Sequence, residues 1–252
     1  MPGPQTRIAL ATFSIGWLLA LAGCGGAGHS SGSKAVAAGV QCVSSPAASG
    51  AIGTAAQEPA TGVSAISGSC WAQITGTPIT EAVIGSMPAG ASATWKAAWT
   101  PQDLYVYADV VTERAVINTN TGAPWEDDSV EIYLSGTNDH SGAYPGLTGQ
   151  LLINSGGLTN STLGTDHAAL PTTHATATEQ TSSTGYQILL SMPWGNLGVS
   201  TPAQGTKIGF TIGVDFPGTG AAHRADGGGQ VMWQGTSTNW ESDAAWGVLQ
   251  LG

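Results

Sequence analysis

Short segments in which apolar and polar residues alternate constrain the fold of this chain more than any other feature. The clearest runs from Ser129 to Leu134, where Val130, Ile132 and Leu134 alternate with polar side chains, as in a half-buried strand. Comparable runs, bounded by Gly, Pro, Asn or Asp, occupy residues 93–99, 104–110, 150–154, 173–180, 185–193, 207–215 and 246–251. The one helical candidate is a turn near residues 194–197. The pattern predicts an all-β protein, an antiparallel β-sandwich of jelly-roll type.

The composition excludes some classes of partner. The 252 residues include 16 Asp and Glu against 6 Lys and Arg, which gives a formal net charge of -10. Such a chain lacks the clustered cations that bind nucleic-acid phosphates or anionic lipid, so neither partner is expected. Carboxylates are compatible with Ca²⁺. Nine Trp against three Phe suit a sugar ligand, because a flat ring can stack on a sugar face.

The first residues have the pattern of an export signal. Arg7 precedes an apolar run, Ile8–Leu21, that is too short to span a bilayer by itself. The run ends in Leu-Ala-Gly-Cys, which resembles a bacterial lipobox with Cys24 as the lipidated residue. We therefore expect a lipoprotein signal peptide at 1–23 and an exported protein, held at the extracytoplasmic face of a membrane by lipid alone. The alternatives are an ordinary cleaved signal and a transmembrane anchor.

Residues 24–62 are rich in Gly, Ala, Ser and Pro, so they are predicted to form a flexible tether before a folded domain at 63–252. Once Cys24 carries lipid, Cys42 and Cys70 remain, and an oxidising compartment would let them pair. This bridge would close a loop of about 28 residues, worth about 3 kcal/mol on the chain-entropy model. The alternative is two separate buried thiols.

The segment 124–134 combines a loop with a strand. Pro124 and Trp125 precede three acids, and the strand that follows places Glu131 on the face away from the core. An aromatic ring and carboxylates at the mouth of a sheet indicate the ligand-facing part of a sugar-binding sandwich. The alternatives are a Trp that caps the end of the sandwich and a solvated glutamate.

Several motifs occur in the order and with the spacing of one known family. They are Trp71, Trp99, Leu104-Tyr105-Val106, Pro124 to Ile132, Gly185-Tyr186, Pro193-Trp194, Ile208-Gly209-Phe210, Asp215, Trp233, Asn239-Trp240 and Trp246-Gly247. Over about residues 63–252 the chain resembles a family 9 carbohydrate-binding module, a type often attached to xylanases. The motif at 124–132 is the most specific of these pieces.

The resemblance implies a β-sandwich with structural calcium that holds the end of a sugar chain between two Trp rings. The rings would be Trp125 and Trp240, and the carboxylate that bonds sugar hydroxyls would be Glu131. Further polar contacts are expected from Tyr133, Asn154, Ser237 and Asn239. Two rings would desolvate the apolar faces of a pyranose, and its hydroxyls would then need polar partners in the plane between the rings.

The sequence departs from the family pattern in the polar residues. Leu152 stands where family members have an arginine that bonds the sugar, and Ser237 stands where they can have Asn. The acid expected for calcium after the strand at 104–110 occurs as Glu113. Asp128 and Asp215 are the other candidate calcium ligands. These differences bear on the identity of the sugar more than on the fold.

The function predicted from the sequence is non-catalytic binding of mono- or oligosaccharides or polysaccharide chain ends, such as xylan or glucan fragments, by a monomer at the cell surface. One rival is a glycoside hydrolase that pairs Glu126 or Asp128 with Glu131. These carboxylates lie on one short segment, and no distant partner stands out. The other rival is a structural or adhesive surface protein with the same sandwich, which the missing arginine at position 152 would favour.

Overall fold

Strands dominate the structure, a computed structural model that describes residues 40–119, 123–154, 157–161, 170–218 and 227–252, without the side chains of 158–161. The strands are β1 (Ile52–Gln57), β2 (Thr77–Pro78), β3 (Glu81–Ile84), β4 (Ser92–Trp99), β5 (Asp103–Val111), β6 (Ser129–Ser135), β7 (Thr148–Asn154), β8 (Gly157–Ser161), β9 (Thr176–Thr181), β10 (Gly185–Pro193), β11 (Lys207–Phe216), β12 (Gly229–Met232) and β13 (Gly247–Leu251). The helical turns are α1 (Ala60–Val63), η1 (Ser69–Ala72), η2 (Pro124–Glu126) and η3 (Trp194–Leu197).

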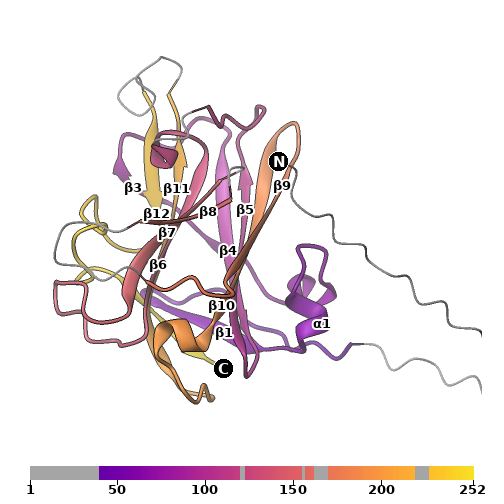
Figure 1. The fold of residues 1–252 in the computed structure, drawn as a ribbon. Helices are drawn as coiled ribbons and strands as arrows, with labels where there is room; N and C mark the ends of the chain where they lie inside the picture. Colours follow the sequence, from indigo (N-terminus) through magenta and orange to yellow (C-terminus); the bar gives the residue numbers. More distant parts are fainter. Residues whose placement is uncertain (1–39, 120–122, 155–156, 162–169, 219–226) are drawn as a thin grey trace, which may run out of the picture. The chain divides into compact units, whose positions relative to one another are not determined.

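The strands follow the order β8-β7-β6-β11-β13-β1-β4-β5-β10-β9, while β12 and β3 extend from β11 and β2 adds to β4. Figure 1 shows β6, β7, β11 and β12 on one side of the domain and β4, β5, β10 and β9 on the other. The predicted β-sandwich is therefore confirmed, and η3 lies at the predicted helical turn. The two runs predicted at 93–99 and 104–110 form a hairpin, in which β4 and β5 pair from Ser92–Val111 to Trp99–Leu104.

The main core lies between the two layers. Val106 and Val110 of β5 and Ile188 and Leu190 of β10 belong to the same buried cluster as apolar residues of the opposite layer. The opposite layer contributes Val130, Ile132 and Leu134 of β6 and Phe210, Ile212 and Val214 of β11. The apolar half of the 129–134 alternation thus faces this core, as predicted.

Each layer also has its outer face covered. Trp71 of η1 and Val63 of α1 pack with Tyr105 and Tyr107 over one layer. Over the other layer, Tyr133 of β6 and Met232 of β12 form a second small cluster with Tyr144 and Trp246. Polar strand positions that would otherwise face solvent are therefore buried under loops.

The structure corrects the boundary predicted between tether and domain. Residues 52–57 were expected to be part of a flexible tether, but they form β1 in the middle of the sheet, between β13 and β4. Both pairings are parallel, unlike the other ladders. The strand is weak by propensity, and it is fixed because Ala55 and Ala56 are buried and both edges are hydrogen-bonded. Gly53 leaves room for the indole of Trp95, which would lie 2.4 Å from an added Cβ.

The predicted signal peptide and the lipidation site Cys24 lie outside the described residues. In the part of the chain that the structure describes, no helix has the length and apolar character needed to cross a membrane.

Candidate functional site

Two tryptophans differ in exposure from the others that the structure describes. Eight of the nine Trp residues lie in the described part of the chain. Six are buried: Trp71, Trp95, Trp99, Trp194, Trp233 and Trp246. By contrast, Trp125 is 40 % exposed and Trp240 is 43 % exposed. These are the two residues whose rings were predicted to hold the sugar.

Trp125 lies in the short helical turn η2, directly before β6. Pro124 occupies the first position of this turn, where its fixed φ suits a helical start and its missing N–H costs nothing. The turn contacts β6, β7 and β11. It is also anchored at its end, because the N–H of Asp128 donates to the carbonyl of Ile117 at 2.9 Å. The ring is thus carried by a loop that is fixed to one layer of the sandwich.

Trp240 lies in the loop between β12 and β13. The preceding residue, Asn239, is buried, and its carbonyl accepts hydrogen bonds from the hydroxyl of Tyr144 and from Nε1 of Trp246. The Trp246 ring contacts the Tyr133 ring of β6 edge to face, with centroids 5.3 Å apart. The exposed Trp240 is therefore tied, through its neighbour, to the outer face of the strand that follows Trp125.

Glu131 and Tyr133 form the polar centre of that face. The Tyr133 hydroxyl donates to Oε2 of Glu131 and accepts a hydrogen bond from Nε2 of Gln150 at 3.0 Å. Burial, together with the charge of Glu131, raises the pKa of Tyr133 well above its ordinary value. Tyr133 thus stays a neutral donor that orients the carboxylate.

The environment of Glu131 differs from the prediction in one respect. It lies on the face opposite the main core, as expected, but it is buried, with 2 % exposure. The reason is the cover supplied by the Tyr144 and Trp246 cluster. Leu152 of β7, also buried, pairs directly with Glu131, so the position of the family arginine is next to this carboxylate.

The other predicted polar contacts fall into different surroundings. Ser237 is exposed in the Trp240 loop, and Asn154 is buried at the end of β7, where its amide donates to Asn118 at 3.4 Å. The Asn239 side chain accepts from the N–H of Thr236 at 2.9 Å and donates to the carbonyl of Gln234 at 3.1 Å. In this arrangement the Asn239 amide holds the loop that carries Trp240.

The candidate calcium ligands do not form one cluster. Asp128 is buried and receives two hydrogen bonds from the Arg114 guanidinium, at 2.5 and 3.0 Å, and one from the N–H of Ile117 at 2.7 Å. Asp215 accepts from Ser129 at 2.8 Å, and Glu113 is exposed. Within the described ranges, none of the three acids belongs to a cluster of three or more His, Cys, Asp or Glu side chains. Calcium binding by these acids therefore stays a prediction.

Several residues of this region were not predicted from the sequence. Gln150, Tyr144 and Arg114 position Tyr133, Asn239 and Asp128, respectively. Gln150 has a sequence signal, since it alternates with Leu151 in a strand-like run and could have been paired with Tyr133. Tyr144 and Arg114 lie in loops whose paths the sequence does not define.

Comparisons with known proteins agree with the fold. Residues 64–252 match the family model described as "Carbohydrate family 9 binding domain-like", so the chain belongs to family 9 of the carbohydrate-binding modules. Endo-1,4-beta-xylanase A of Thermoanaerobacterium saccharolyticum is 33 % identical over 169 residues, which are 64 % of this chain and 13 % of that protein. Endo-1,4-beta-xylanase A of Thermotoga maritima is 29 % identical over 174 residues, 68 % of this chain and 15 % of that protein. The chain therefore spans only a small part of the length of these relatives.

Solved structures of the same family share the architecture. A family 9 module from Caldicellulosiruptor kristjanssonii, solved in complex with glucose, superposes with a TM-score of 0.64 at 20 % identity. The alignment covers 80 % of this chain and 95 % of that one. A second structure, of a family 9 module from the same organism with cellotriose, gives a TM-score of 0.63 at 19 % identity, with 79 % and 93 % coverage. At this identity the similarity establishes the fold.

Proposed function

We propose that this chain binds carbohydrate without catalysing its cleavage, and that a sugar ring is held between Trp125 and Trp240. The observation that carries the proposal is the exposure of these two rings, 40 % and 43 %, in a domain whose other described tryptophans are buried. Leaving large apolar rings in water forgoes the free energy of burying them, which is roughly 1.5–3 kcal/mol for a large apolar side chain. A ligand with flat apolar faces would recover part of this free energy by covering the rings.

The polar residues on the outer face of β6 support the same function. Glu131 is a hydrogen-bond acceptor whose direction is set by Tyr133, and a carboxylate makes charge-assisted bonds to hydroxyl groups that are stronger than neutral ones. A sugar hydroxyl at this position would compete for a carboxylate that is already oriented. The proposed division of roles is that the two rings supply affinity and Glu131 with Tyr133 selects the orientation of the sugar.

The proposed ligands are glucan or xylan fragments and their chain ends. The matched family modules from Caldicellulosiruptor kristjanssonii were solved with glucose and with cellotriose, and the two relatives described above are endo-1,4-beta-xylanases. Two rings that stack on opposite faces of one sugar suit a chain end better than the middle of a chain, because a terminal ring can enter the space between them. We propose a place in polysaccharide catabolism on this basis.

Two further expectations remain proposals. We propose calcium as a structural ion; binding through Asp128 would compete with its ion pair to Arg114. Thermal unfolding of the protein with added calcium, compared with thermal unfolding in the presence of a chelator, tests calcium binding. An unchanged melting temperature would count against a structural ion. Lipid attachment at Cys24, with export to the extracytoplasmic face, can be tested by mass spectrometry of the mature N-terminus from a bacterial host.

The direct experiment is isothermal titration of the purified chain with glucose, xylose, cellobiose, xylobiose and cellotriose. We expect saturable binding of at least one of these sugars with one site per chain. The same preparation, incubated with xylan or cellulose, is expected to release no reducing ends. Release would favour the hydrolase, whereas absence of binding to every sugar would favour the adhesive protein.

A further inference from the structure

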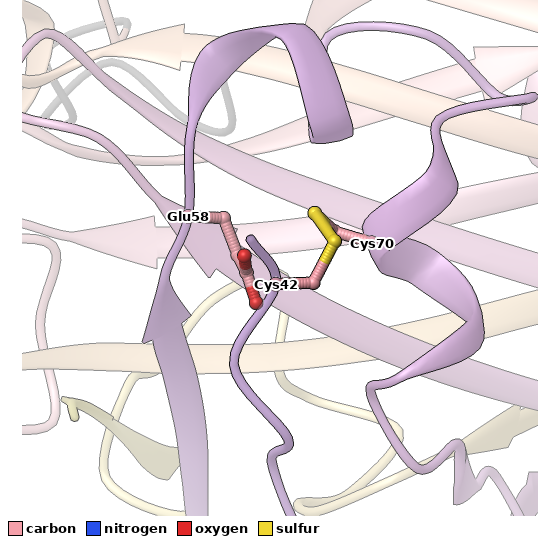
Figure 2. Close-up of side chains that lie close together, drawn as sticks. All are labelled: Cys42, Glu58 and Cys70. Carbon is pink, nitrogen blue, oxygen red and sulfur yellow. A yellow bond between two sulfur atoms is a disulfide. The ribbon is translucent and has the colours of Figure 1, made fainter. Parts of the chain in front are cut away.

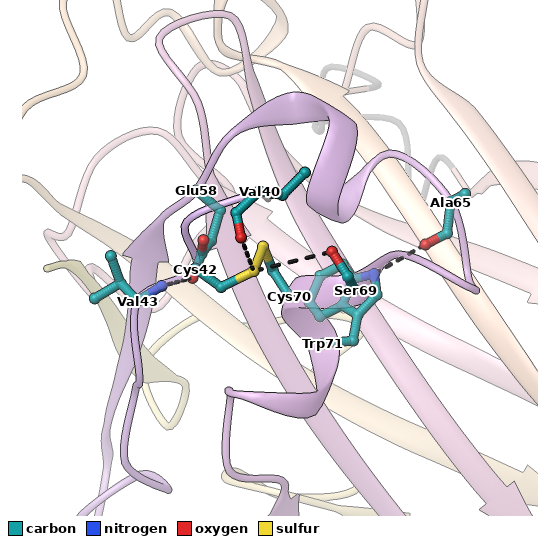
Figure 3. Close-up of a disulfide and its surroundings, with 8 residues drawn as sticks. All are labelled: Val40, Cys42, Val43, Glu58, Ala65, Ser69, Cys70 and Trp71. Atoms are coloured by element: carbon teal, nitrogen blue, oxygen red, sulfur yellow. Dashed lines mark hydrogen bonds between the residues drawn. A yellow bond between two sulfur atoms is a disulfide. The ribbon is translucent and has the colours of Figure 1, made fainter. Parts of the chain in front are cut away.

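A disulfide fastens the segment before β1 to the outer face of the domain. Cys42 and Cys70 are joined, as the sequence analysis expected, with their Cα atoms 5.1 Å apart. Cys70 is fully buried in η1, and Cys42 is partly exposed. Figure 3 shows the bridge between the segment at Val43 and the helical turn that carries Trp71. A reductant therefore has access to the Cys42 side of the bond.

A buried carboxylate lies against this disulfide. Glu58, the residue after β1, is only 4 % exposed. Its Oε1 accepts the N–H of Val43 at 2.9 Å, but its Oε2 is buried without a hydrogen-bond partner. Figure 2 shows the carboxylate directed toward Cys42 and its bond to Cys70. An unsatisfied buried oxygen is costly, and the disulfide offers it no donor.

The three side chains have the spacing of a metal site. One ligand atom from each of Cys42, Glu58 and Cys70 lies within 4.8 Å of the others. In tetrahedral zinc sites the Zn–S distance is about 2.3 Å and the Zn–O distance about 2.0–2.2 Å, so ligand atoms are roughly 3.5–3.8 Å apart. Reduction breaks the bond between the two sulfurs and leaves both free to act as ligands beside Glu58.

We propose that reduction of the Cys42–Cys70 bridge creates a site for a thiophilic divalent cation such as Zn²⁺. The ligands are the two thiolates and the Glu58 carboxylate, and a water completes the tetrahedron. A dithiol reductant supplies two electrons and two protons; the S–S bond breaks, both cysteines become thiols, and the reductant becomes a disulfide. Binding of the cation then releases the two thiol protons.

The site gives Oε2 of Glu58 a partner that it lacks in the oxidised protein. The ion would also hold residues 40–45 against η1 in the reduced protein, as the disulfide does in the oxidised one. The reduced chain would thus keep residues 40–45 packed beside Trp71 and Tyr107 before the disulfide forms. This site lies on the layer opposite to Glu131 and is independent of sugar binding.

The test uses the full chain with Cys24→Ser, so that only two thiols remain. The protein is reduced with a phosphine under nitrogen and titrated with Cd²⁺, whose bonds to thiolate absorb in the ultraviolet, and then with Zn²⁺ in competition. We expect one ion per reduced chain and none for the oxidised chain. Cys42→Ser should abolish binding, and Glu58→Gln should weaken it at least tenfold.

Glu81→Gln, which changes an exposed acid on β3, serves as the matched control and should bind like the parent. Glu58→Asp provides a second variant with a retracted carboxylate and should also bind more weakly. Near-ultraviolet circular dichroism reports whether the reduced chain keeps its fold. The proposal is overturned if the reduced chain unfolds, if it binds no ion, or if the Glu58 variants bind as tightly as the parent.

Discussion

Glu131 of β6 and Leu152 of β7 lie directly opposite each other, with their side chains on the same face of the sheet. The family resemblance places a sugar-binding arginine at position 152, so this chain has an apolar side chain beside the carboxylate. Hydrogen bonds from Gln150 to Tyr133 and from Tyr133 to Glu131 occupy the same face. The polar groups on this face of the sheet are therefore neutral donors and one carboxylate.

Restoring the arginine should strengthen sugar binding. In Leu152→Arg the guanidinium would add charge-assisted donors next to Glu131, worth about 1.5–3 kcal/mol before the cost of burying it. We expect the Kd for the preferred sugar to fall about tenfold, measured by isothermal titration. Leu152→Met, which keeps an apolar side chain of similar volume, should leave the Kd unchanged. Equal affinities for the two variants would show that position 152 does not contact the ligand.

Removing the Tyr133 hydroxyl should weaken both stability and binding. Tyr133→Phe leaves Glu131 and Gln150 without their shared partner in a buried region, so the free energy of unfolding should fall by about 1–3 kcal/mol. The sugar Kd should rise as well, because the carboxylate loses the group that orients it. Urea unfolding measures the first effect and titration the second. A stable variant with unchanged Kd would separate Tyr133 from the site.

Gly53 should be intolerant of a side chain. A Cβ there would lie 2.4 Å from the Trp95 indole, which belongs to the core, so Gly53→Ala should destabilise the domain by about 1–3 kcal/mol. Gly195 in η3 provides the control, because no atom lies within 4 Å of an added Cβ. Thermal melts should place Gly53→Ala well below the parent and Gly195→Ala close to it. Similar melts for both would contradict the central position of β1.

Glu179 on β9 should make stability depend on pH. Both carboxylate oxygens are buried without hydrogen-bond partners, and burial, with the Asp128 charge second, raises the pKa of Glu179 to about 7. Because this pKa lies above its ordinary 4.5, the folded state binds the proton more tightly. The stabilisation of the folded state by the protonated Glu179 is complete below about pH 4 and is lost as the pH rises through 7.

Glu179→Gln should therefore melt like the parent near pH 4 and about 2–4 °C above it at pH 8, which corresponds to about 1 kcal/mol for a partly exposed group. Glu81→Gln, on the exposed strand β3, should show no such difference. If the difference in melting temperature between the parent and Glu179→Gln is the same at pH 4 and at pH 8, the pKa of Glu179 is not raised.

The sequence was sufficient for the sandwich and for its two exposed rings. Alternation identified β4, β5, β6 and β10, because these strands bury one apolar face against the core and carry branched or aromatic side chains. The same rule could not identify β1: its Gly and Ala residues have low strand propensity, and it is held by neighbours far away in the sequence. Strand assignment there depends on tertiary pairing.

The site was only partly predictable for a related reason. The alternation of apolar and polar residues placed Glu131 on the face opposite the core. No local pattern shows that Tyr144 and Trp246, which lie in loops, cover Glu131. Likewise, the sequence does not reveal that Asp128 is paired with Arg114, because Arg114 comes from a loop 14 residues earlier in the sequence. Side chains from irregular segments decide whether a carboxylate is solvated, paired or available to a ligand.

The measurement closest to the central claim is titration of the preferred sugar into the parent, Trp125→Ala and Trp240→Ala. Leu147→Ala, which also removes an exposed apolar side chain, is the control. Stacking on an aromatic ring should contribute about 1.4 kcal/mol or more, so each Trp variant should lose at least tenfold in affinity while remaining folded, and the control should bind normally. Undiminished binding by both Trp variants would contradict the account.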